Sequence, residues 1–130
     1  MKGMFFLLFC IVFLPGIAAA ELDPQAYYEL EIQARELTLE GMMKRLTCMR
    51  NNCQLSEQYM IDEDYQQNIL MLHEKNGTTP SRLAAWYTHH AVETENYRMT
   101  NPQLQMRLDT LSTSFEKLSD EINSVLEAQQ

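Results

Sequence analysis

Residues 102–126 read PQLQMRLDTLSTSFEKLSDEINSVL, and this stretch decides the fold class. Apolar residues recur at alternating intervals of four and three: Leu104, Leu108, Leu111, Phe115, Leu118, Ile122 and Val125. Three heptads of this kind predict a long helix, ~37 Å at 1.5 Å per residue, whose seam must be covered by another helix. The covering helix belongs either to the same chain or to a second copy, which would give a homodimer through residues 102–126.

Helical spacing of apolar residues also extends over most of the chain between residue 24 and residue 100. Proline preceded by a capping residue predicts helix starts at Asp23-Pro24, Thr79-Pro80 and Asn101-Pro102. Asn76-Gly77 ends the second helix, for which Ser56 or Asp62 is the candidate cap. Residues 88–100 are ambiguous, and no β alternation has a useful length. We therefore predict an all-α fold, a small up-and-down bundle of three to four helices packed near-antiparallel.

The first predicted helix, from residue 24 to about residue 50, contains a glycine at position 41. Glycine costs ~1 kcal/mol relative to alanine inside a helix, so Gly41 marks a kink or a close helix contact. Acid–base pairs four residues apart are expected at Glu31/Arg35 and Glu40/Lys44, where the acid comes first in the favourable order, and at Lys117/Glu121.

Residues 1–20, MKGMFFLLFCIVFLPGIAAA, are typical of a cleaved secretory signal peptide. A positive residue precedes eleven apolar residues, too few for the ~20 of a membrane span, and small residues precede the expected cleavage after Ala20. We expect a single helical domain over residues 21–130, periplasmic or secreted.

The expected mature chain is strongly acidic. Removal of Lys2 leaves nine of the ten basic residues against all eighteen acidic ones, a formal net charge of −9. Nucleic acids and anionic membrane surfaces attract cationic patches, so neither is expected as a partner. This charge is compatible with a basic protein partner. It is equally compatible with acidic residues that serve only to keep the protein soluble.

Cys48 and Cys53 are the two cysteines of the expected mature chain. In an exported protein a close pair predicts a disulfide, and Asn51-Asn52 provides the helix break that the bond needs. A redox pair usually has two intervening residues rather than four, and a metal site would need further ligands.

Cofactor and metal signals are weak. His89 and Glu93 have the four-residue spacing that could chelate one ion on a helix, but two ligands do not close a site. We expect instead that His90 packs on an apolar face with a hydrogen-bonded ring while His89 is solvated. The scattered methionines suit core filling or a malleable surface better than copper binding. We predict no cofactor and no enzymatic activity.

Tyrosine and tryptophan give the strongest hint of function. Six tyrosines and one tryptophan lie in the expected mature chain, and such side chains are enriched in recognition surfaces. In each of the adjacent pairs, 27–28 and 86–87, at least one ring must lie outside a narrow buried stripe. Tyr28, Trp86 and Tyr87 are therefore the candidate partner-binding residues. Asn76-Gly77-Thr78 matches a glycosylation sequon, which is relevant only in a eukaryotic secretory pathway.

Three functions follow as expectations. The first is a non-enzymatic envelope protein that binds another protein as an adaptor, assembly factor or chaperone. The second is an inhibitor or immunity protein that neutralises a basic exported enzyme, steered by its negative charge. The third is a periplasmic metal-binding protein that uses His89 and Glu93.

Overall fold

The structure, a computed structural model, describes residues 21–130, and the predicted signal peptide lies outside these residues. The described chain is all-α, as predicted, but it contains five helices rather than three or four. Their bounds are α1 Pro24–Arg50, α2 Leu55–Lys75, α3 Pro80–His89, α4 Ala91–Met99 and α5 Pro102–Ala128. The additional helix arises because the segment from 88 to 100 breaks at His90 into α3 and α4.

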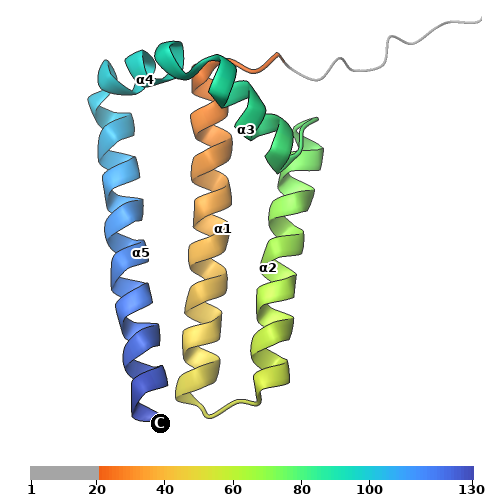
Figure 1. Ribbon diagram of the computed structural model, residues 1–130, viewed down its shortest axis with the longest axis vertical. Helices are drawn as coiled ribbons and strands as arrows, with labels where there is room; N and C mark the ends of the chain where they lie inside the picture. Colours follow the sequence, from red (N-terminus) through yellow and green to blue (C-terminus); the bar gives the residue numbers. More distant parts are fainter. Residues whose placement is uncertain (1–20) are drawn as a thin grey trace, which may run out of the picture.

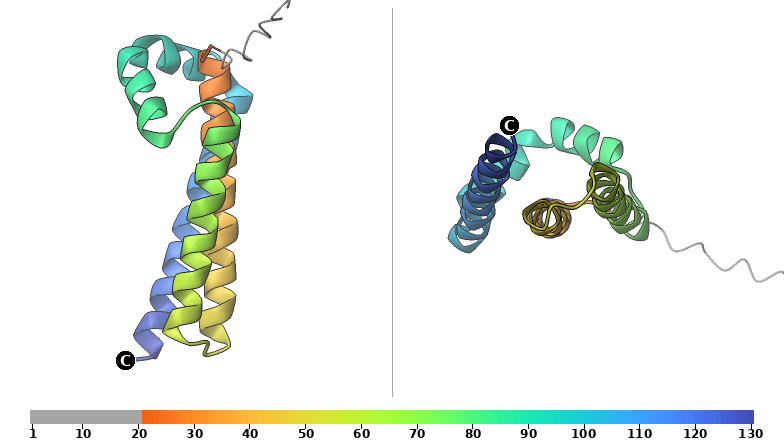
Figure 2. Two further views of the ribbon diagram at one scale, coloured as in Figure 1. Left: turned by 90° about the vertical axis from the view of Figure 1, so that its right-hand side faces the viewer. Right: turned by 90° about the horizontal axis from the view of Figure 1, so that it is seen from below.

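Three long helices lie side by side, and α3 and α4 cross the end of the molecule where α1 begins (Figure 1). α1 lies between α2 and α5 and packs against both of them (Figure 2). α1 and α2 are antiparallel, as expected for an up-and-down bundle, but α1 and α5 run in the same direction. The crossing segment causes this difference, because it carries the chain past α1 before α5 begins.

The heptad seam of α5 faces α1. Leu104, Leu108 and Leu111 are buried together with Tyr28 and Ile32 of α1, and these five residues form the principal core cluster. The remaining seam residues are half-buried: Phe115, Leu118, Ile122 and Val125. The seam therefore finds a covering helix within the same chain, and its N-terminal half is not free to pair with a second copy.

Helix boundaries follow the capping chemistry at three of the predicted positions, and α5 begins at the predicted proline although the Asn101 side chain makes no capping hydrogen bond. Asp23 accepts a hydrogen bond from the Ala26 amide at 2.7 Å, and Thr79 caps α3 in the same way. Gly77 has φ 70°, the left-handed conformation expected after α2. Pro102 occupies the first turn of α5.

The predicted cap of α2 was wrong. α2 begins at Leu55, and the backbone N–H of Gln54 donates to the Glu57 carboxylate at 2.8 Å. Ser56 and Asp62 therefore lie inside the helix. α2 starts earlier than predicted because the turn between α1 and α2 is very short. Asn52 in this turn has φ 55°, the left-handed conformation that reverses the chain.

Ion pairs align the long helices. The α1–α5 contact is bridged near one end by Glu29–Arg107 at 2.7 Å and near the other by Arg50–Glu121 at 2.9 Å. Glu121 was expected to pair with Lys117, but Arg50 of the neighbouring helix takes this carboxylate instead. The expected pairs Glu31/Arg35 and Glu40/Lys44 are both present. Such exposed pairs are screened by solvent, so they set alignment more than stability.

Gly41 marks a close contact between α1 and α2. It is buried, and the Tyr65 side chain of α2 packs directly over its backbone. A Cβ placed on Gly41 would lie only 2.7 Å from the Tyr65 Cβ and closer still to the ring. The missing side chain is therefore what permits the two helices to approach at this point.

We predict that Gly41→Ala destabilises the protein although alanine is the better helix former. Overpacking costs roughly 1–3 kcal/mol, whereas the gain in helix propensity is ~1 kcal/mol. Urea unfolding followed by circular dichroism measures the difference. In a Tyr65→Gly background, which removes the Cβ as well as the ring, the clash disappears, so there Gly41→Ala should become neutral or stabilising. Equal effects in both backgrounds would contradict the proposed contact.

Cys48 and Cys53 form a disulfide, as predicted, with their Cα atoms 5.2 Å apart. The bond closes a ring of six residues across the turn between α1 and α2. Cys48 is the third-last residue of α1, and Cys53 follows the Asn51-Asn52 break. The disulfide therefore fixes the hairpin formed by these two helices.

Replacement of both cysteines by serine should lower the free energy of unfolding by ~2 kcal/mol, the chain-entropy value for so small a ring. Thermal melts of the oxidised protein, the reduced protein and the Cys48→Ser/Cys53→Ser variant provide the measurement. Reduction and substitution should give the same shift. A melting temperature unchanged by both treatments would show that the bond contributes nothing to stability.

Candidate functional site

The predicted partner-binding residues come together where α3 and α4 cross the start of α1. Tyr27 of α1 stacks on Trp86 and on Tyr87, with ring centroids 5.7 and 5.2 Å apart. Tyr28 contacts Tyr27 edge to face at 5.1 Å and stacks on Tyr97 of α4 at 6.3 Å. We call this group the aromatic cluster: Tyr27, Tyr28, Trp86, Tyr87, His90 and Tyr97.

Members of the aromatic cluster differ in their access to solvent. Tyr28 is only 6% exposed, so its ring belongs to the core and is not available to a partner. Trp86 and Tyr87 are half-buried, as is Tyr27. The sequence does not distinguish the buried ring of Tyr28 from the half-buried rings, because the side of α1 that faces α5 is set by how the helices pack.

His90 is built into the aromatic cluster at the break between α3 and α4. Its Nδ1–H donates to the Trp86 carbonyl at 2.8 Å, and its ring stacks on the indole with centroids 4.3 Å apart. The ring is half-buried and hydrogen-bonded, as expected, and His89 is exposed. His90 thus supports the outer side of Trp86.

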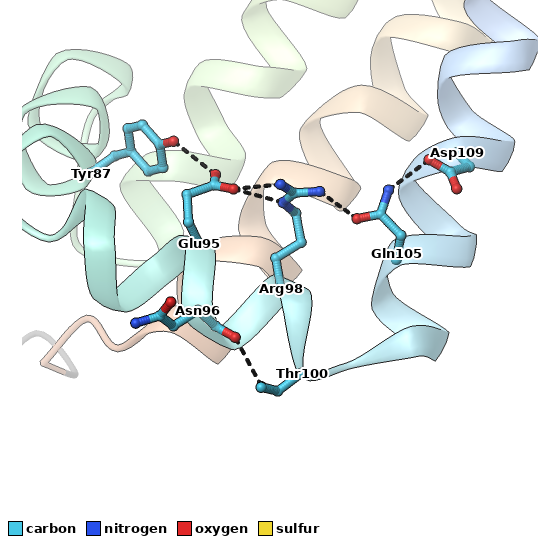
Figure 3. A network of polar contacts seen from close by, with 7 residues as sticks. All are labelled: Tyr87, Glu95, Asn96, Arg98, Thr100, Gln105 and Asp109. Carbon is cyan, nitrogen blue, oxygen red and sulfur yellow. Dashed lines mark hydrogen bonds and ion pairs between the residues drawn. The ribbon is translucent and has the colours of Figure 1, made fainter.

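A polar network fixes the other side of the cluster (Figure 3). The Tyr87 hydroxyl donates to Glu95 Oε1 at 2.9 Å, and Arg98 Nε donates to Glu95 Oε2 at 2.9 Å. Arg98 also donates to the Gln105 side chain, whose amide donates to Asp109 at 2.7 Å. The network therefore connects α3, α4 and α5, and it holds Tyr87 in one position.

Electrostatics in this network favour the ionised carboxylate. Hydrogen bonds from Arg98 and from Tyr87 lower the pKa of Glu95 below the usual value for a glutamate. The same bond to Glu95 raises the pKa of the Tyr87 phenol. Burial, together with the nearby Glu31 carboxylate, raises the pKa of Tyr27 well above its usual value. Tyr27 and Tyr87 therefore remain protonated at physiological pH.

Potential metal ligands are not gathered at the histidines. Helix α3 ends at His89 and α4 begins at Ala91, so His89 and Glu93 do not share the continuous helix that their spacing argument required. In residues 21–130, ligand atoms come together in groups of three or more only at Cys48, Cys53 and Glu57. The two sulfur atoms of that group are bonded to each other.

A second surface was missed by sequence reasoning. The solvent side of α2 carries five of the ten exposed large hydrophobic residues in the described chain: Leu55, Tyr59, Met60, Leu70 and Met71. The pattern is hard to see in the sequence, because α2 also has an inner apolar face toward α1. With apolar residues on both faces, no single stripe stands out.

No protein-family model, curated protein or solved structure matches this chain. Within residues 21–130, none of the five helices combines the length and apolar character needed to cross a bilayer.

We predict that acid weakens the network at Glu95. A carboxylate whose pKa is lowered by folding stabilises the fold above the ordinary glutamate pKa, and this contribution is lost as pH falls through the lowered value. The difference in unfolding free energy between wild type and Glu95→Gln should therefore be largest near pH 7 and shrink below about pH 4.3. Urea denaturation across this range provides the measurement.

Glu93→Gln is the matched control for this prediction, since Glu93 is an exposed glutamate of the same helix without an ion pair in the described chain. A Glu95→Gln difference that stays constant from neutral to acidic pH would show that the carboxylate charge has no role in holding the segment.

Proposed function

We propose that this chain is a non-enzymatic exported protein that binds another protein of the cell envelope, as an adaptor, assembly factor or chaperone. The observation that carries the proposal is the solvent-facing edge of the aromatic cluster, formed by Tyr27, Trp86 and Tyr87. Stacking fixes the three rings to one another, and the bond to Glu95 fixes Tyr87.

Rings held in this way are suited to recognition. Aromatic side chains supply a large contact area, and side chains already fixed lose little conformational entropy when a partner binds. Tyrosine and tryptophan also keep polar atoms for hydrogen bonds at the edge of a contact. A rigid aromatic edge at one end of a long bundle is accordingly a reasonable anchor for a partner protein.

Export is the second part of the proposal. The predicted signal peptide over residues 1–20 supports it, and a structural disulfide accords with an oxidising compartment such as the periplasm or the extracellular space. A stable hairpin closed by this bond would also suit a protein that acts outside the reducing cytosol.

An inhibitor or immunity protein against a basic exported enzyme is the alternative, and the distribution of charge favours it. Ion pairs occupy six of the nine basic residues in the described chain, leaving three bases against twelve carboxylates outside such pairs. On α5, Asp109, Glu116, Asp120 and Glu127 are all exposed and recur along one side of the helix. Such a surface would speed association with a cationic protein at low salt.

Affinity capture with immobilised residues 21–130 tests both functions. Proteins from a native envelope extract that bind the wild type should be recovered roughly tenfold less by Trp86→Ala, the expected effect of removing an aromatic anchor. Met106→Ala is the matched control, because Met106 is an exposed apolar residue on a different helix. Circular dichroism confirms that both variants fold.

The outcomes separate the two functions. Binding that depends on Trp86 and persists at high salt supports the adaptor, whereas binding that falls steeply with salt supports the inhibitor. Equal recovery by wild type and Trp86→Ala would remove the aromatic cluster as the binding surface. The only tryptophan in the chain is Trp86, so a shift in its fluorescence reports contact with the partner directly.

A further inference from the structure

The outer face of α2 has a symmetrical arrangement. At 100° per residue, Tyr59 and Leu70 lie on one side of this face, and Met60 and Met71 lie on the other. Each pair is separated by eleven residues, about 16 Å along the helix. The four side chains are between 44% and 69% exposed. Both pairs are centred at the midpoint of the helix, close to residue 65.

Polar residues follow the line between the two apolar pairs. They are Ser56, Glu63, Gln67 and Glu74, and all four are exposed. Neither glutamate takes part in an ion pair within residues 21–130. The outer face therefore has apolar edges and a polar centre with two free carboxylates.

These positions make the face complementary to itself. When a second copy is placed antiparallel about a twofold axis at the midpoint, each edge meets its own counterpart with the direction reversed. Tyr59 then lies opposite Leu70 of the second copy, and Met60 lies opposite Met71. Along the centre Glu63 lies opposite Gln67, and Ser56 lies opposite Glu74.

Polar side chains are compatible with the same pairing. Glu63 and Glu74 each lie opposite an amide or a hydroxyl that can donate a hydrogen bond, rather than opposite another glutamate. Like charges opposite each other would oppose association.

We propose that the outer face of α2 is a homodimer interface in which two copies of α2 pack antiparallel. The proposal concerns a different surface from residues 102–126, and it does not depend on the function proposed for the aromatic cluster. A 21-residue helix is about 31 Å long, so the contact falls at the small end of specific interfaces. The dimer is accordingly weak and its formation depends on concentration.

Sedimentation equilibrium of residues 21–130 over a wide concentration range tests the proposal. The wild type should show a reversible monomer–dimer equilibrium. Met60→Glu should weaken dimerisation about tenfold or more, because it places a charge against Met71 of the second copy. Met106→Glu is the matched control: the two methionines are 69% and 67% exposed, and Met106 lies on α5. This control should dimerise as the wild type does.

A charge-pairing experiment tests the antiparallel arrangement itself. In the double variant Met60→Lys/Met71→Glu, each lysine faces a glutamate of the second copy at both ends of the interface, so dimerisation should be restored relative to Met60→Lys alone. Met60→Glu/Met71→Glu should remain monomeric. A wild type that is monomeric at all concentrations, or equal dimerisation of the Met60→Glu and Met106→Glu variants, would overturn the proposal.

Discussion

The requirement that α1 be covered on two opposite sides governs the rest of the structure. Tyr28, Ile32 and Leu46 are buried on the side toward α5, and Leu30 and Gly41 are buried on the side toward α2. A single partner helix could cover only one of these sides. The chain therefore has to place α2 and α5 on either side of α1, and the crossing of α3 and α4 over the start of α1 follows from that need.

Much of the fold could be predicted from local chemistry. The seam at 104–125 predicted a long helix in need of a cover, and α5 packs on α1 as that seam requires. Helix starts with an oxygen-bearing cap before proline were placed correctly, because capping depends on residues three positions apart. The disulfide followed from the spacing of Cys48 and Cys53 together with the break between them.

Most failures involve contacts between segments distant in sequence; the cap of α2, set by Gln54 and Glu57 three residues apart, is the exception. Glu121 pairs with Arg50 rather than with Lys117, and the choice depends on which helix lies beside α5. Tyr28 and Tyr27 are adjacent, yet one ring enters the core and the other reaches the surface of the aromatic cluster. The exposed apolar side of α2 was not predicted, because the sequence of a helix with two apolar faces resembles that of a wholly buried helix. The seven seam residues showed no such ambiguity.

The position of the disulfide has a consequence for the order in which the molecule assembles. Cys48 and Cys53 are five residues apart, so closing their ring requires only local chain motion, which is fast compared with long-range docking. Oxidation therefore does not have to wait for a native core. Once the ring has closed, α1 and α2 are held at their turn as a nascent hairpin. The turn between α1 and α2 is then fixed whether or not α5 has docked.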